Sequence, residues 1–62
     1  MRFKNKTVIV TGAGSGIGET TAIKFAQEGA NVVIADIDPI NGITVTTKIN
    51  DANGSALFVE TD

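Results

Sequence analysis

The fold of this chain is decided by residues 7–18, TVIVTGAGSGIG, where an apolar run leads directly into a loop with four glycines. Val8, Ile9 and Val10 are consecutive and apolar, which predicts a strand over residues 6–11 that is buried on both faces of a parallel sheet. Because glycine weakens strands and helices, four glycines in so short a stretch indicate a special requirement on the backbone. That requirement is either a tight turn or the close approach of a ligand.

Downstream of the loop, helical and extended patterns alternate. Small and apolar residues recur at helical spacing from Gly16, and Gly29 is a typical helix stop. Asp38 and Pro39 are typical of the cap and first turn of a second helix, although Gly42 and the β-branched residues after it are weak helix formers. Alternation of this kind predicts a parallel sheet with right-handed crossovers. The expected elements are a strand at 6–11, a helix from 16, a strand at 31–36, a helix from 39 and a strand at 55–60.

Length and composition bound the class of protein. With 62 residues the chain forms at most one small domain, and its 42% hydrophobic content argues against disorder. The absence of Cys excludes disulfides, and the absence of His excludes a Cys/His metal site as well. A domain of this size buries only about 60% of the surface that its unfolded chain exposes. We therefore expect the chain to belong to a larger fold or to an assembly.

Charge and hydropathy narrow the range of partners. The formal net charge is −2 and the isoelectric point is near 4.8, so we expect no nucleic-acid partner. The basic N-terminus is followed by an apolar run that is too short for a secretory signal, and no apolar run approaches the length of a membrane span. We expect a soluble, cytoplasmic protein with no membrane partner.

A strand that passes through a glycine-rich loop into a helix forms an anion site, because the helix N-terminus offers backbone N–H groups and a partial positive charge. Gly12 allows the chain to turn off the strand, Gly16 lies where a phosphate would approach, and Gly18 lets the helix pack closely on the strand. The Ser15 hydroxyl is a further donor for the phosphate. The alternative is a structural strand-to-helix turn that binds nothing.

The spacing of the glycines distinguishes between phosphate-binding motifs. The pattern G-x-G-x-x-G fails because Ile17 stands where its last glycine would be, and no Gly-Lys-Ser/Thr follows to make a P-loop. The motif present at 11–18, Thr-Gly-x-x-x-Gly-Ile-Gly, resembles that of the short-chain dehydrogenase/reductase family. The similarity continues in register through residues 5–38, NKTVIVTGAGSGIGETTAIKFAQEGANVVIADID. It implies an α/β fold, the first β-α-β-α-β half of a Rossmann fold, with a parallel three-stranded sheet in the order 3-2-1.

Asp36 ends the second expected strand and lies 18 residues after Gly18, close to the roughly 20 residues at which dinucleotide sites place their ribose-binding acid. Its carboxylate would accept hydrogen bonds from both adenosine-ribose hydroxyls and repel a 2′-phosphate. NADP-preferring members of the family place a basic residue at the position of Ser15 or Ile37, and neither is basic here. The resemblance therefore implies NAD, rather than NADP, as the preferred cofactor. The alternative for Asp36 is a solvated carboxylate or a helix cap.

The resemblance assigns three further residues to the cofactor. Asp62 matches the family acid that contacts the adenine amino group, Ile37 would flank the adenine ring, and Ile17 would lie beside the pyrophosphate. For Asp62 a solvated position at the chain end is an equally open alternative. The expected cofactor-binding residues are Gly12, Ser15, Gly16, Ile17, Gly18, Asp36, Ile37 and Asp62.

The residues that perform the family's chemistry are missing from the chain. That chemistry needs a Tyr, a Lys four residues after it, a Ser and an Asn; there is no Tyr here, and neither Ser15 nor Ser55 matches the catalytic Ser. We expect residues 1–62 to be a single partial Rossmann segment, inactive alone, of a homo-oligomeric NAD-dependent oxidoreductase that moves hydride between NAD(H) and an alcohol or carbonyl substrate. The alternative is a non-catalytic half-Rossmann module for nucleotide binding or protein interaction.

Overall fold

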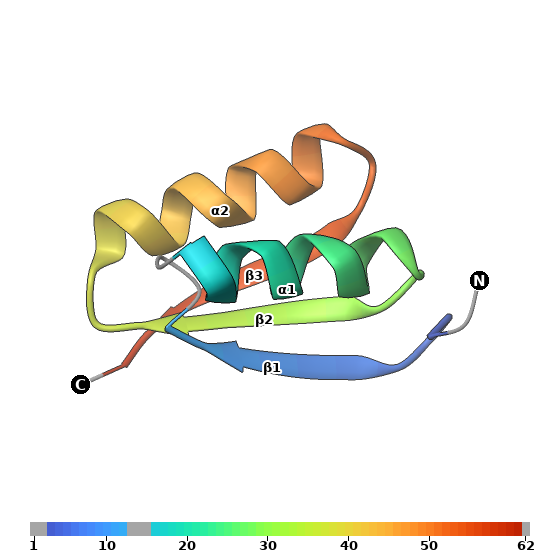
Figure 1. Cartoon of the computed structure of the whole chain (residues 1–62), viewed down its shortest axis with the longest axis horizontal. Helices are drawn as coiled ribbons and strands as arrows, with labels where there is room; N and C mark the ends of the chain where they lie inside the picture. Colours follow the sequence, from blue (N-terminus) through green and yellow to red (C-terminus); the bar gives the residue numbers. More distant parts are fainter. Residues whose placement is uncertain (1–2, 13–15, 62) are drawn as a thin grey trace.

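The computed structural model describes residues 3–12 and 16–61, and its elements alternate in the predicted order (Figure 1). The elements are β1 (Thr7–Thr11), α1 (Gly16–Gln27), β2 (Asn31–Asp36), α2 (Pro39–Asp51) and β3 (Ser55–Glu60). The strands form one parallel sheet in which β2 lies between β1 and β3, which is the predicted 3-2-1 order. The β-α-β-α-β prediction is therefore confirmed, and β1 starts one residue later than expected.

Both helices cover the same face of the sheet and contact each other (Figure 1). Right-handed crossovers put both helices on one side when the chain keeps moving in one direction across a parallel sheet. Val10, Ile34 and Phe58 lie side by side across the three strands, and they pack beneath these helices. The buried core consists of Val10, Ala22, Ala30, Val32, Ile34, Val45 and Ile49.

The opposite face of the sheet is left uncovered by the residues that the structure describes. Ile9, Val33 and Leu57 are neighbours in register on this face, and Ile9 and Leu57 are 67% and 63% exposed. The prediction that the run from Val8 to Val10 is buried on both faces is therefore wrong for this structure. This face is exposed because both crossover helices lie on the other side of the sheet.

The start of α2 explains how weak helix formers are tolerated there. The Asp38 carboxylate accepts a hydrogen bond from the Ile40 N–H at 3.0 Å, and Pro39 occupies the first turn, so the predicted cap is confirmed. Gly42 is buried, and a Cβ at this position would lie 2.1 Å from a ring carbon of Phe58. Gly42 thus allows α2 to approach β3, and this packing offsets its low helix propensity.

The two helices are short, with 12 residues in α1 and 13 in α2. Gly29, just after α1, has a φ of +92°, which agrees with the predicted helix stop. Within the described ranges, no helix is long and apolar enough to cross a membrane.

Candidate functional site

The carboxyl ends of the three strands meet at one edge of the sheet, which is also where α1 begins (Figure 1). In open parallel sheets, ligands bind in the crevice outside these strand ends. At this edge the described residues form a hollow of about 190 Å³. It is lined by Thr11, Gly12, Ala35, Asp36, Ile37 and Thr61.

Two backbone hydrogen bonds extend the sheet past its strand ends and set the walls of this hollow. The Gly12 N–H donates to the Ala35 carbonyl at 3.0 Å, and the Thr61 N–H donates to the Asp36 carbonyl at 2.9 Å. The first bond fixes the start of the glycine loop against β2, and the second fixes the residue that follows β3. Three chain segments are thereby held together at the place where a ligand would bind.

The described glycines of the loop differ in why a glycine stands at each position. Gly12 has a φ of +65°, a left-handed conformation that glycine adopts without penalty, and a Cβ there would meet nothing within 4 Å. Gly16 has no positive φ, and a Cβ there would also meet nothing within 4 Å. The backbone conformation therefore favours a glycine at residue 12, whereas Gly16 leaves open space at the N-terminus of α1. Gly18 is half-buried in the first turn, as expected where the helix packs closely.

A second hollow, of about 430 Å³, runs along β1 and shares Gly12 with the first. Ile17 lines this second hollow and is 85% exposed, while Ile37 lines the first and is 68% exposed. Large apolar side chains with this exposure contribute little to the core. Their position at the rims of both hollows suits contact with a flat or apolar part of a ligand.

Asp36 is half-buried at the end of β2, and the backbone orients its carboxylate. The Asp38 N–H donates a hydrogen bond to Oδ1 of Asp36 at 3.0 Å. The cap of α2 is supplied by Asp38, so the alternative in which Asp36 itself caps the helix is not supported. The carboxylate of Asp36 is instead held at the wall of the first hollow.

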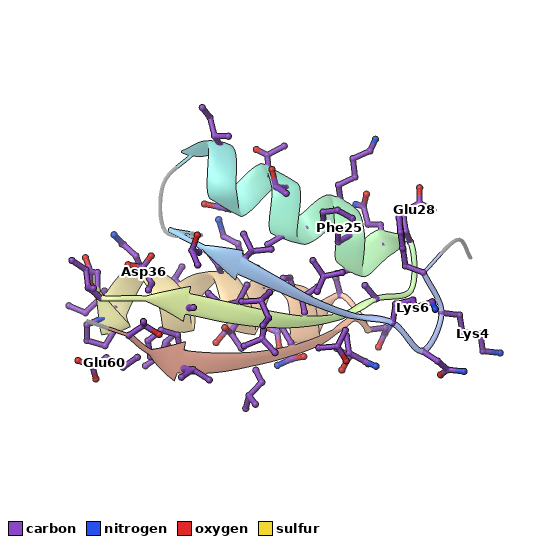
Figure 2. The ribbon with its side chains drawn as sticks, turned by 90° about the horizontal axis from the view of Figure 1, so that it is seen from below. Lys4, Lys6, Phe25, Glu28, Asp36 and Glu60 are labelled. Carbon is purple, nitrogen blue, oxygen red and sulfur yellow. The ribbon has the colours of Figure 1, made fainter. Side chains whose placement is uncertain are left out.

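The two ends of the sheet carry different charged side chains (Figure 2). Asp36 and Glu60 lie at the carboxyl edge, whereas Lys4 and Lys6 lie at the amino end together with Glu28. In the first turn of α1, the Glu19 carboxylate pairs with the ammonium group of a lysine on α2 at 2.6 Å. The positive end of the helix dipole attracts an anion, and the negative charge of Glu19 lies near it. The pairing with the lysine compensates that negative charge.

The predicted cofactor-binding residues that the structure describes converge at this edge. Gly12, Asp36 and Ile37 share the first hollow, and Ile17 and Gly18 share the second hollow with Gly12. Gly16 stands at the start of α1, at the head of the same edge. The structure thus brings the residues of the glycine motif and those of the second strand end into one region.

Two predicted residues, Ser15 and Asp62, lie outside the described residues. Three lining residues were missed by the sequence reasoning: Thr11, Ala35 and Thr61. Their position could have identified them, because each is at or beside the carboxyl end of a strand, where ligands of parallel sheets bind. Their side-chain types carry no such signal.

The comparisons with known proteins agree with this geometry. The sequence matches the family model of the short chain dehydrogenases over residues 6–62. It is 45% identical to an uncharacterized oxidoreductase of Listeria innocua, in an alignment of 64 residues that covers 100% of this chain and 25% of that protein. The chain belongs to the short-chain dehydrogenase family, and the resemblance in its glycine motif is confirmed.

Solved structures of the family show the same fold. A 7α-hydroxysteroid dehydrogenase complexed with NADH and 7-oxo glycochenodeoxycholic acid is 41% identical, with a TM-score of 0.94 over 98% of this chain and 24% of that chain. A metagenomic short-chain oxidoreductase in complex with NADP is 32% identical, with a TM-score of 0.95 over 100% of this chain and 28% of that chain. The chain thus spans about a quarter of the length of these relatives. Since the two structures hold different dinucleotides, family membership alone does not decide the cofactor preference.

Proposed function

We propose that residues 1–62 are the adenine-dinucleotide-binding part, a partial Rossmann segment, of an oxidoreductase that moves hydride between NAD(H) and an alcohol or carbonyl substrate. The observation that carries this proposal is the convergence of three features at one sheet edge. They are the left-handed Gly12, the N-terminus of α1 and the oriented carboxylate of Asp36. NADH and NADP in the solved relatives support a nicotinamide dinucleotide as the ligand.

In this proposal the glycine loop and α1 hold the pyrophosphate. The first N–H groups of a helix lack partners within the helix, and the helix dipole favours a negative group there. The open space at Gly16 admits the phosphate to this position, and Ile17 flanks it. Ser15 supplies a hydroxyl, an assignment that rests on the sequence motif alone.

The adenosine half of the cofactor is assigned to the first hollow. Asp36 accepts hydrogen bonds from the ribose hydroxyls, and Ile37 lies against the adenine ring. Asp62 contacts the adenine amino group, again on the sequence motif alone. A carboxylate at the ribose disfavours a 2′-phosphate, and the positions of Ser15 and Ile37 carry no basic side chain to attract one. We therefore propose NAD as the preferred cofactor.

Catalysis is assigned to residues beyond this segment. The nicotinamide supplies the hydride chemistry when it is bound, and these residues bind and orient its adenosine end. The Tyr that serves the family as general acid or base is missing from the chain, and there is no His that could replace it. The isolated segment is expected to give no NADH production with any secondary alcohol, and measurable turnover by the pure segment would contradict this.

The test is the affinity of the full-length protein for NAD and NADP, measured by titration calorimetry. Asp36→Ala removes charged hydrogen bonds worth about 1.5–3 kcal/mol, so the Kd for NAD rises roughly tenfold to a hundredfold. The Kd for NADP changes less, which narrows the preference. Asp51→Ala, an exposed carboxylate at the end of α2, is the matched control and leaves both values unchanged.

Two results would count against the proposal. Equal affinity of the unmutated protein for NAD and NADP would show that Asp36 does not select the cofactor. Binding of NAD without any turnover on a panel of alcohols and ketones would favour the non-catalytic nucleotide-binding module.

A further inference from the structure

Glu60, the last residue of β3, pairs in register with Asp36, the last residue of β2. Neighbouring strands lie about 4.8 Å apart, and side chains at paired positions leave the same face of the sheet. Phe58, two residues earlier on β3, packs on the core beneath α2, which identifies this face as the one that the helices cover. Figure 2 shows Asp36 and Glu60 at the same end of the sheet. The two acidic side chains are therefore lateral neighbours.

Among the described residues, no basic side chain pairs with Glu60. Glu60 is exposed, and within the part of the chain that the structure describes no ion pair involves its carboxylate. The described lysines lie at the amino end of the sheet, in the last turn of α1 or in the ion pair with α1 (Lys4, Lys6, Lys24 and Lys48). A group held at Asp36 therefore faces a second negative charge from the adjacent strand.

We propose that Glu60 is a second specificity-determining residue, which disfavours a 2′-phosphate on the adenosine ribose. The inference rests on the proposed function, since it needs a dinucleotide whose ribose lies at Asp36. The two carboxylates act differently. Asp36 lines the hollow and binds the ribose hydroxyls, so it affects NAD and NADP, whereas Glu60 is outside the lining and acts through its charge. Glu60 therefore affects NADP alone.

The experiment compares Glu60→Gln with Glu28→Gln in the full-length protein. Glu28 lies at the opposite end of the sheet (Figure 2), and the hydrogen bonds found for it among the described residues are made by its backbone N–H and carbonyl, so it is the matched control. At low salt, Glu60→Gln lowers the Kd for NADP roughly twofold to fivefold, as expected for a screened charge a few ångströms from a phosphate. The Kd for NAD is unchanged, and the control changes neither value.

Salt dependence separates the effect of the charge from the effect of side-chain shape. The Debye length falls from about 10 Å at 0.1 M salt to about 3 Å at 1 M, so the gain in NADP affinity shrinks toward zero at high salt. Glu60→Lys reverses the charge and gives a larger gain than Glu60→Gln. An unchanged NADP Kd in both variants at low salt would overturn the proposal, as would an equal change for NAD and NADP.

The outcome also separates this inference from the proposed function. Tight NAD binding with a strong preference over NADP, combined with no effect of either Glu60 variant, refutes the role of Glu60 and leaves the proposed function standing. A full-length protein that binds neither dinucleotide refutes both.

Discussion

The two ends of the sheet are built for different tasks. At the amino end, the Phe3 N–H donates to the Glu28 carbonyl at 2.8 Å, and the Asn31 N–H donates to the Lys6 carbonyl at 2.7 Å. The rings of Phe3 and Phe25 meet edge to face with centroids 5.2 Å apart. Chain segments on both sides of α1 are thereby tied together, and this end is closed by backbone hydrogen bonds and aromatic packing.

The carboxyl end is left open by comparison. It carries a left-handed glycine at residue 12, the exposed side chains of Ile17 and Ile37, and the carboxylates of Asp36 and Glu60. These features contribute little to stability, because they bury little apolar surface and place like charges side by side. Packing interactions are thus concentrated at one end of the sheet, while the other end keeps the groups that a ligand needs. Three predictions test this division.

The largest effect on stability is expected at the closed end. Phe25→Ala removes a half-buried ring that packs on Phe3, so the free energy of unfolding falls by about 2–3 kcal/mol, somewhat less than for a fully buried Phe. Urea denaturation of the full-length protein followed by circular dichroism measures this loss. The Kd for NAD is unchanged. A rise in that Kd as large as the one caused by Asp36→Ala would break the division between the two ends.

The next largest effect on stability is expected at Gly12, and it distinguishes this residue from Gly16, the first residue of α1. Gly12→Ala forces a side chain into the left-handed conformation and lowers the free energy of unfolding by about 1–2 kcal/mol. Gly16→Ala is the matched control, because both positions are open but only Gly12 has a positive φ. It changes stability by less than about 0.5 kcal/mol and still weakens NAD binding, since the methyl group occupies the approach to the pyrophosphate. Undiminished NAD binding in Gly16→Ala would show that no ligand approaches there.

The smallest effect concerns the cap of α2. Asp38→Ala removes the carboxylate that accepts from the Ile40 N–H and lowers the free energy of unfolding by about 1 kcal/mol. Asp38→Asn keeps a capping side chain and is the control, with a loss of only a few tenths of this value. The backbone N–H of residue 38 still orients Asp36, so the Kd for NAD changes less than threefold in calorimetry. A larger change would show that the cap also supports the ribose site.

Much of the fold could be predicted from local patterns. The five elements, the stop at Gly29 and the cap at Asp38 follow from periodicity and from short-range backbone chemistry, and all are observed. The exposure of Ile9 could not be predicted in this way. An apolar run of three residues is compatible with a strand covered on both faces, and only the side chosen by the crossovers decides which face is covered. The same holds for Gly42, whose contact with Phe58 depends on how α2 sits over β3.

The family follows from the amino-acid sequence, through the spacing of its glycines, and so do Asp36 and the glycine loop as the candidate cofactor site. These are short-range features, since a turn, a cap or a motif depends on residues that are close in the chain. The neighbours of that site, in contrast, follow from the tertiary structure. The pairing of Asp36 with Glu60 and the placement of Thr61 beside it come from the register of β2 and β3. Register depends on which residues of neighbouring strands are buried together under the helices, so it brings together residues that are distant in the chain.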